Sequence, residues 1–135
     1  MTSVDDRTER VRELFEIPFH RAHDITIVEA TRDSAETMIP FDESLLGNPE
    51  IPAIHGGVIS ALADLTGAVP MVAAVDTYTP TVDLRVDYLT HAGKAPLRGE
   101  SSVRRRGGSI GVADIEIRSA GQRCAVAKGV YKLDL

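Results

Sequence analysis

The stretch that decides the fold is one long apolar run from Gly57 to Val75, GVISALADLTGAVPMVAAV. A helix of this length is nearly long enough to cross a bilayer. Asp64 stands near its middle, however, where a carboxylate costs roughly 2.5–3.5 kcal/mol on membrane-insertion scales. Gly67 and Pro70 weaken a membrane helix further, and no basic cluster flanks the run. We therefore expect a helix buried inside a globular domain, with no membrane as partner.

The composition indicates one domain, residues 1–135. The chain has 135 residues, 43% hydrophobic and only 4% aromatic, so the core must be built from aliphatic side chains and alanine. Its single cysteine, Cys124, cannot form an internal disulfide and falls in an expected strand, where it is interpreted as a small core residue. The first sixteen residues are charged and lack the apolar core of a signal peptide, so a cytoplasmic location is expected.

The charge is unevenly distributed along the chain. The net charge of −5 argues against a nucleic-acid partner. Residues 1–84 carry five basic and fifteen acidic side chains, whereas residues 85–135 carry ten basic and five acidic ones. Two interpretations remain open: an acidic ligand near the C-terminal half, or strands with solvated basic faces.

Before the apolar run, the sequence predicts a helix and two strands. Residues 3–16 can form a short amphipathic helix that Ser3 caps and Pro18 ends, so that residues 1–20 are an N-terminal helix and its leading segment. Residues 24–31 and 34–41 are typical of strands joined by a tight turn. The stretch 42–54 is rich in glycine and proline and predicts a loop with at most one helical turn.

After the run, four strands are expected. In 79–89 apolar and polar residues alternate, which puts Val82, Leu84, Val86 and Tyr88 on one face and Thr81 on the other. Three further strands near 96–105, 109–118 and 123–133 are separated by glycine-containing hairpin signals. The expected fold is α+β: a long central helix wrapped by an antiparallel sheet of about five to six strands, with a short N-terminal helix.

Two places on the central helix could carry chemistry. The helix begins at His55-Gly56-Gly57, and glycines there let a ligand approach backbone N–H groups that have no partner within the helix. These donors and the helix dipole suit a carbonyl oxygen that becomes negative. Asp64 is the only ionisable residue between Gly56 and Val75, so it is a candidate base or nucleophile. The alternatives are a tight loop-to-helix joint and a structural carboxylate.

The spacing of these two places predicts a shared site. Gly56 and Asp64 are eight residues apart, a rise of about 12 Å on one helix. A reacting carbonyl needs its oxyanion donor and its nucleophile at roughly 3 Å, so one helix cannot supply both. Two helices packed antiparallel across a two-fold axis can, with Gly56 of one chain facing Asp64 of the other. Activity would then require a symmetric dimer.

A third candidate is the basic turn formed by Arg104, Arg105, Arg106, Gly107, Gly108 and Ser109. Arginines beside a glycine-rich hairpin can hold phosphates through charge and backbone donors, and the alternative is a solvated strand end. His20 and His23 lack the acidic or cysteine neighbours of a metal site. We expect no metal and no cofactor.

The stretch from Gly47-Asn48 through His55-Gly56-Gly57 to Asp64 resembles the signature of hotdog-fold acyl-CoA thioesterases of the PaaI type. The resemblance continues through 81–89 and 105–117 and covers roughly residues 40–133. It implies a helix wrapped by a sheet, homodimers that often pair into homotetramers, and hydrolysis of an acyl-CoA to a free acid and coenzyme A.

The resemblance also implies roles for individual residues. Asp64 would be the base or nucleophile, the Gly56 N–H would polarise the thioester carbonyl, and Asn48 would position substrate or water. His55 would orient the helix entrance, and Thr81 would assist the attacking water. Substrate would further contact Gly57, and the nucleotide end of coenzyme A would lie near Arg105, Arg106, Gly107, Gly108 and Ser109.

Two other functions remain as alternatives. One is a hotdog dehydratase or hydratase, whose signature sets an aspartate and an asparagine closer before the histidine than the seven positions from Asn48 to His55. The other is a non-catalytic acyl-CoA sensor, which would be expected to lose the carboxylate at position 64 or to append a DNA-binding segment.

Overall fold

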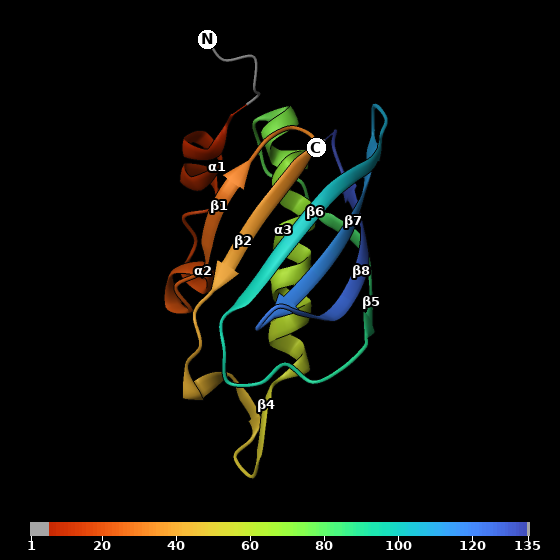
Figure 1. Cartoon of the computed structure of the whole chain (residues 1–135). Helices are drawn as coiled ribbons and strands as arrows, with labels where there is room; N and C mark the ends of the chain where they lie inside the picture. Colours follow the sequence, from red (N-terminus) through yellow and green to blue (C-terminus); the bar gives the residue numbers. More distant parts are fainter. Residues whose placement is uncertain (1–5, 135) are drawn as a thin grey trace.

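The structure is a computed structural model that describes residues 6–134. One long helix, α3 (Gly56–Val75), lies against a six-stranded antiparallel sheet that curves around it (Figure 1). The sheet has the order β1-β2-β6-β7-β8-β5. Its strands are β1 (Thr26–Ala30), β2 (Ser34–Ile39), β5 (Thr81–Tyr88), β6 (Leu97–Arg106), β7 (Ile110–Ser119) and β8 (Gln122–Lys132). The expected hotdog architecture is confirmed.

The apolar composition of α3 is explained by its position. By length and hydropathy the helix could cross a membrane, yet most of it is buried within the fold. Leu62, Val69 and Met71 have no exposed surface, because the sheet covers them. The helix ends at Asp76, whose left-handed backbone (φ 58°) stops the coil and whose N–H is donated to the Val72 carbonyl.

Pro70 lies inside α3 and leaves one helix carbonyl without its usual N–H donor, which a side chain of the sheet replaces. Proline has no N–H, so the carbonyl four residues earlier, that of Thr66, loses its helical donor. The Ser101 hydroxyl on β6 donates to this carbonyl at 2.7 Å. Thr66 and Ser101 are both buried, so water cannot reach this carbonyl. The Ser101 hydroxyl therefore supplies the hydrogen bond that the helix lacks. A side chain of the sheet thus completes the hydrogen bonding of the helix.

The expected hairpins between the C-terminal strands are confirmed. β6 pairs with β7 and β7 with β8 in antiparallel register. Ala120 and Gly121 both have positive φ at the β7–β8 turn. The small buried residues Ala113 and Ala125 let α3 lie close to the sheet. Cys124 is buried as expected, and burial raises the pKa of its thiol.

The N-terminal expectation needs correction. The single helix expected over 3–16 is a shorter α1 (Thr8–Leu14), followed by a second helix, α2 (Pro18–Ala22). Pro18 ends the first helix and also begins the second, because its fixed φ suits a first helical turn. The expected cap Ser3 lies outside the described residues. Both short helices stand beside β1, at the edge of the sheet (Figure 1).

The segment 42–54 also differs from its expected loop. The expected helical turn is present as a 3₁₀ turn, η1 (Glu43–Leu45), and is followed by a hairpin of β3 (Leu46–Asn48) and β4 (Ile51–Ile54). A two-stranded ribbon leaves one edge of each strand unpaired, so it tolerates Pro52. This hairpin leads directly into α3 and therefore positions its first turn.

The link between Pro70 and Ser101 can be tested by a double-mutant cycle. Ser101→Ala should lower the free energy of unfolding by about 1–3 kcal/mol, because a buried carbonyl loses its donor. In a Pro70→Ala background the same change should cost about 1 kcal/mol less, since the new N–H at position 70 can reach the Thr66 carbonyl. Urea denaturation of the four proteins measures the coupling. Strictly additive losses would contradict this account.

Candidate active site

The first turn of α3 is organised by His55. Its ring Nδ1 accepts the Gly57 N–H at 2.8 Å, and its carbonyl accepts the Val58 N–H at 2.9 Å. A β-carbon at position 57 would lie 2.9 Å from the histidine ring, so glycine is required for this cap. Within residues 6–134 the Gly56 N–H has no acceptor. One donor at the positive end of the helix is therefore available to a ligand.

Tyr88, the last residue of β5, lies over this first turn. Its hydroxyl donates to the Gly56 carbonyl at 2.9 Å and also hydrogen bonds to Ser60. A β-carbon on Gly56 would meet the tyrosine ring at 3.4 Å. The alternation in 79–89 put Tyr88 on the same face as Leu84 and Val86, but Tyr88 was not among the predicted site residues. The available signal was an aromatic residue near the end of an alternating strand, on the face that carries the apolar residues.

A cleft of about 690 Å³ opens beside this turn. Asn48, His55, Gly56 and Tyr88 all line it. The Asn48 side-chain oxygen accepts the Glu50 N–H at 2.9 Å, so it closes the β3–β4 turn. Four of the predicted or newly found site residues therefore share one cleft, with the amide group of Asn48 in a structural turn at its rim.

Asp64 stands two turns further along α3 and is only partly exposed. The Thr81 hydroxyl donates to its carboxylate Oδ1 at 2.6 Å. Strict alternation put Thr81 on the face opposite Tyr88, which is wrong for this residue, because both side chains reach α3. A register shift between Thr81 and Asp83 turns the threonine towards the helix, as β-bulges commonly do next to active sites.

Asp64 has a second hydroxyl partner on the neighbouring strand. The Tyr131 hydroxyl on β8 donates to the backbone carbonyl of Asp64 at 2.9 Å. Burial raises the pKa of this phenol, and the negative Asp64 carboxylate raises it further. At neutral pH the Tyr131 hydroxyl therefore keeps its proton and can act as a hydrogen-bond donor.

The carboxylate lies at the wall of a small apolar pocket of about 220 Å³. Ala61, Leu65 and Ala68 of α3 form one side, and Phe15, Ile17 and Phe19 from the α1–α2 region form another. This pocket shares no lining residue with the cleft at Gly56. Within one chain the Gly56 N–H and the Asp64 carboxylate thus line separate cavities, as their spacing on the helix predicts.

The basic turn lies away from both hollows of the same chain. None of residues 105–109 lines the cleft or the pocket. Arg106 hydrogen bonds to the Arg32 carbonyl and forms an ion pair with Asp33 at 3.5 Å. Gly107 donates its N–H to the Ile110 carbonyl and closes the β6–β7 hairpin, with Gly108 and Ser109 at its exposed tip. Arg105 is exposed.

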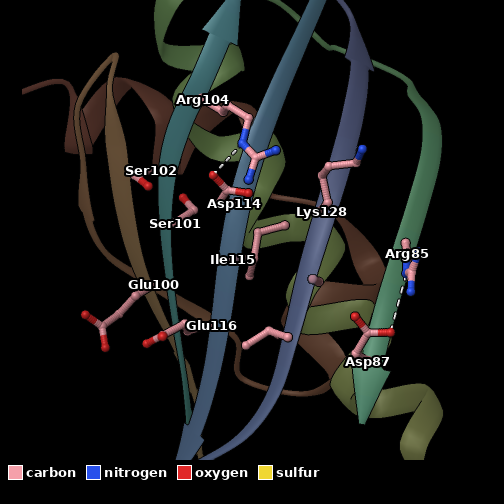
Figure 2. Close-up of a pocket in the computed structure, with 12 residues that line it drawn as sticks. Arg85, Asp87, Glu100, Ser101, Ser102, Arg104, Asp114, Ile115, Glu116 and Lys128 are labelled. Atoms are coloured by element: carbon pink, nitrogen blue, oxygen red, sulfur yellow. Dashed lines mark hydrogen bonds and ion pairs between the residues drawn. The ribbon is translucent and has the colours of Figure 1, made fainter.

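The sheet face away from α3 carries many of the remaining C-terminal charges. A hollow of about 520 Å³ on this face is lined by charged side chains from four strands (Figure 2). Arg104 pairs with Asp114 at 3.0 Å, and Arg85 pairs with Asp87 at 3.4 Å. The first pair joins β6 to β7 and the second lies within β5, and none of these four residues lines the pocket at Asp64.

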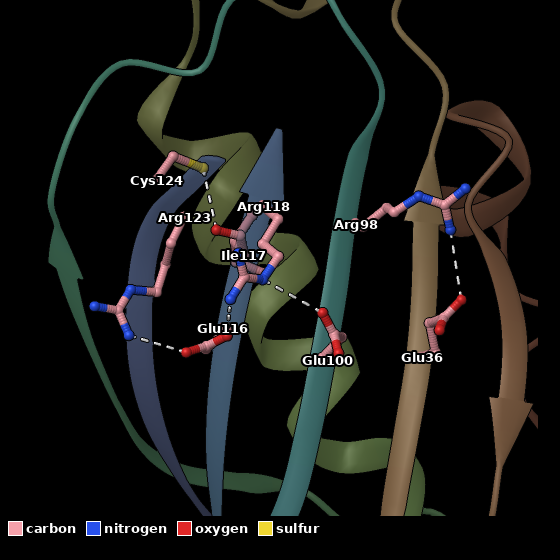
Figure 3. Close-up of polar contacts among 8 residues, drawn as sticks. All are labelled: Glu36, Arg98, Glu100, Glu116, Ile117, Arg118, Arg123 and Cys124. Carbon is pink, nitrogen blue, oxygen red and sulfur yellow. Dashed lines mark hydrogen bonds and ion pairs between the residues drawn. The ribbon is translucent and has the colours of Figure 1, made fainter. Parts of the chain in front are cut away.

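A second set of ion pairs continues across the same sheet (Figure 3). Glu116 accepts from Arg123 at 3.0 Å and from Arg118 at 3.1 Å, and the Arg123 bond is the main reason why the pKa of this carboxyl is lowered. Arg98 pairs with Glu36 at 3.4 Å. Much of the basic excess after residue 84 is therefore neutralised by acidic neighbours, which favours the solvated-face interpretation for these strands.

The capping role of His55 makes a prediction. His55→Ala should lower the free energy of unfolding by about 1 kcal/mol, because the Gly57 N–H loses its acceptor. His55→Asn should retain most of the stability, since asparagine is a good N-cap residue. Urea denaturation compares the two variants. Equal losses in both would show that the ring acts through packing alone.

The chain matches known proteins over most of its length. The family model for the thioesterase superfamily matches residues 52–126, more than half of the chain. The medium/long-chain acyl-CoA thioesterase YigI of Escherichia coli is 25% identical over 124 residues, which cover 81% of this chain and 80% of that protein.

Solved structures agree with this match. A Shewanella oneidensis protein related to the thioesterase superfamily superposes with a TM-score of 0.82 at 28% identity, covering 93% of this chain and 94% of that one. A phenylacetic acid degradation-related protein from Ralstonia eutropha shares the fold, with a TM-score of 0.80 at 22% identity and coverage of 90% and 95%. The chain belongs to the thioesterase superfamily and is a hotdog-fold thioester hydrolase.

Proposed function

We propose that this protein hydrolyses acyl-CoA thioesters to a free acid and coenzyme A, with Asp64 acting on the carbonyl carbon. The observation that carries the proposal is a carboxylate held by a hydroxyl at the wall of an apolar pocket. Thr81 occupies Oδ1, so Oδ2 can attack the thioester or take a proton from water. A curated relative is named as an acyl-CoA thioesterase, which supports this substrate class.

The Gly56 N–H is the proposed oxyanion donor, supplied by a partner chain. Along one helix it stands about 12 Å from the carboxylate, too far to serve the same carbonyl. Ser60 is the midpoint between residues 56 and 64, so a two-fold axis there brings Gly56 of each chain opposite the partner's Asp64. The least buried stripe of α3 has this position: it contains Gly57, Ser60, Ala61 and Asp64.

The sheet edge favours the same dimer. β5 pairs with β8 on one side and is the last strand of the sheet. Val82, Tyr88 and Leu89, on this strand or just after it, are each more than half exposed. An unpaired strand with apolar side chains is a natural surface for a second copy, and antiparallel pairing of two β5 strands would extend one sheet through both chains.

The same dimer gives the basic turn a role. The β6–β7 turn lies near the C-terminal end of α3 (Figure 1). Because the two α3 helices of the proposed dimer run antiparallel, this turn would lie towards the N-terminal end of the partner's helix. Residues 105–109 would then approach the partner's cleft, where the arginines and the hairpin tip can contact the phosphates of coenzyme A. We propose this turn as the nucleotide-binding rim.

The shared site predicts complementation between two inactive variants. Asp64→Asn and Gly56→Val should each lose at least about a hundredfold in kcat, because each lacks one essential group. A one-to-one mixture, after proven subunit exchange, should recover up to about a quarter of wild-type activity, since half of the dimers are mixed and each holds one intact site.

Free-thiol release from a panel of acyl-CoAs measures this recovery. Exchange without recovered activity would refute the shared site. Equal turnover by wild type and Asp64→Asn would refute the role of Asp64. Tight acyl-CoA binding by calorimetry without thiol release would instead indicate a sensor.

The pocket beside Asp64 also bears on the acyl group. An apolar protein cavity of about 150 Å³ holds a benzene ring, so about 220 Å³ suits a phenyl-sized group or an alkyl chain of about six to eight carbons. Ile17, Phe19 and Tyr78 line it and are at least 40% exposed, as expected for side chains that an apolar ligand would cover. We propose that the acyl group enters here.

Changing Phe19 should therefore change acyl preference. Phe19→Ala enlarges the pocket, so the ratio of kcat/KM for longer over shorter acyl chains should rise about tenfold. Thiol release from a series running from butyryl-CoA to palmitoyl-CoA, with phenylacetyl-CoA included, measures this ratio. Val28→Ala is the matched control, because Val28 is also exposed and apolar but lies on β1 outside this pocket. An unchanged profile in Phe19→Ala would place the acyl group elsewhere.

A further inference from the structure

Tyr131 occupies a slot that two glycines leave open. A β-carbon at Gly67 on α3 or at Gly129 on β8 would each lie 2.3 Å from the tyrosine hydroxyl oxygen. The side chain is fully buried, and its hydroxyl reaches the backbone carbonyl of Asp64. Phenylalanine would fill almost the same volume, so the shape of the slot alone does not explain the hydroxyl.

The Asp64 carbonyl does not need this hydroxyl for its own hydrogen bonding. It lies inside α3, where the N–H four residues later already donates to it. A buried phenol, in contrast, does need an acceptor for its hydroxyl. The acceptor that it has is the backbone of the one residue whose carboxylate lines the apolar pocket.

The second hydrogen bond to Asp64 comes from the residue directly opposite Tyr131. Thr81 and Tyr131 are register partners in the β5–β8 ladder. Thr81 holds the carboxylate Oδ1 and Tyr131 holds the backbone carbonyl of the same residue. One cross-strand pair therefore fixes Asp64 at both ends, so that its position relative to the pocket is set by the sheet as well as by the helix.

We propose that Tyr131 is a positioning residue for Asp64, which it holds jointly with Thr81 so that the free carboxylate oxygen faces the pocket. Tyr131 lines neither the pocket at Asp64 nor the cleft at Gly56, so it does not contact substrate itself. The inference rests on the proposed hydrolysis, because it assigns a task within that site. It adds a residue of β8 to a site otherwise built from α3, the β3–β4 hairpin and β5.

Tyr131→Phe tests this proposal, because it removes the hydroxyl and keeps the ring. We expect kcat for the best acyl-CoA to fall roughly ten- to hundredfold, since a carboxylate displaced by about 1 Å loses its attack geometry. KM should change by less than about twofold, because the pocket walls are unchanged. A loss confined to KM, or an unaltered kcat, would overturn the proposal.

Ser101→Ala is the matched control for a purely structural effect. Ser101 also donates a buried hydroxyl to a carbonyl of α3, that of Thr66, but it touches no part of the proposed site. It should lose stability while keeping kcat, measured where denaturation curves show both variants fully folded. An equal fall of kcat in Ser101→Ala would mean that any weakened helix contact reduces activity, and the positioning role would be wrong.

A double-mutant cycle tests whether the hydrogen bonds from Thr81 and Tyr131 position Asp64 jointly. Thr81 and Tyr131 bond different atoms of Asp64 but both position its carboxylate. The double variant Thr81→Val, Tyr131→Phe should therefore lose clearly less kcat than the product of the two single losses. Independent, multiplicative losses would contradict a shared task.

A crystal structure of Tyr131→Phe separates this inference from the proposed function. In that structure the Asp64 carboxylate should leave the Thr81 hydroxyl or occupy two conformers. If the wild type hydrolyses no acyl-CoA, the proposed function fails, and the carboxylate position alone decides the inference. A carboxylate still bound to Thr81 in its original place would overturn the positioning role whatever the activity.

Discussion

Burial of α3 is the constraint on which the rest of the structure depends. The helix is apolar around almost its whole circumference, so no side of its C-terminal half can face water without loss of hydrophobic stabilisation. The sheet curves around it, and α1 contacts it from the side. What remains partly uncovered is the stripe that carries Asp64. The carboxylate therefore stands where the helix is least buried and where a ligand or a second chain can reach it.

The same packing explains how a carboxylate is tolerated there. A charged group beside an apolar core is costly unless it is hydrogen bonded. Here the donor is a threonine turned inward by a bulge, and a tyrosine holds the backbone behind it. The slot for that tyrosine contains a glycine in the middle of the helix, a position that costs about 1 kcal/mol relative to alanine. Local helix propensity is thus lower at the point where the site needs space.

The elements that follow simple periodicities could be predicted from the sequence. Alternation in the last four strands, the glycine turns and the apolar run defined the helix, the hairpins and their order. The N-terminal region was harder, because Pro18 both ends and begins a helix. The β3–β4 hairpin was missed because glycine and proline indicate loops and short edge strands equally well. The roles assigned to the site residues all stay predictions: Asp64, Gly56, Gly57, His55, Asn48, Thr81 and the basic turn.

Other parts of the site could not be read from a linear pattern. The inward orientation of Thr81 depends on a register shift that has no local sequence signal. Tyr131 looks like one more inner-face residue of its strand, because its partner is a backbone carbonyl 67 positions earlier. Tyr88 covers the first turn of α3 from a strand 32 residues later. Each relation exists only after the sheet has closed over the helix.

The pairing of Pro70 with Ser101 has a consequence for the order of folding. The donor that Thr66 lacks within the helix comes from a strand 35 residues further along the chain. During synthesis, α3 emerges with a break in its hydrogen-bond ladder, and water serves the open carbonyl until β6 has been made and docked. Because helix formation is cooperative, such a break weakens the isolated segment. The most apolar helix of this chain is therefore less stable on its own, and we expect it to form fully only when the sheet packs against it.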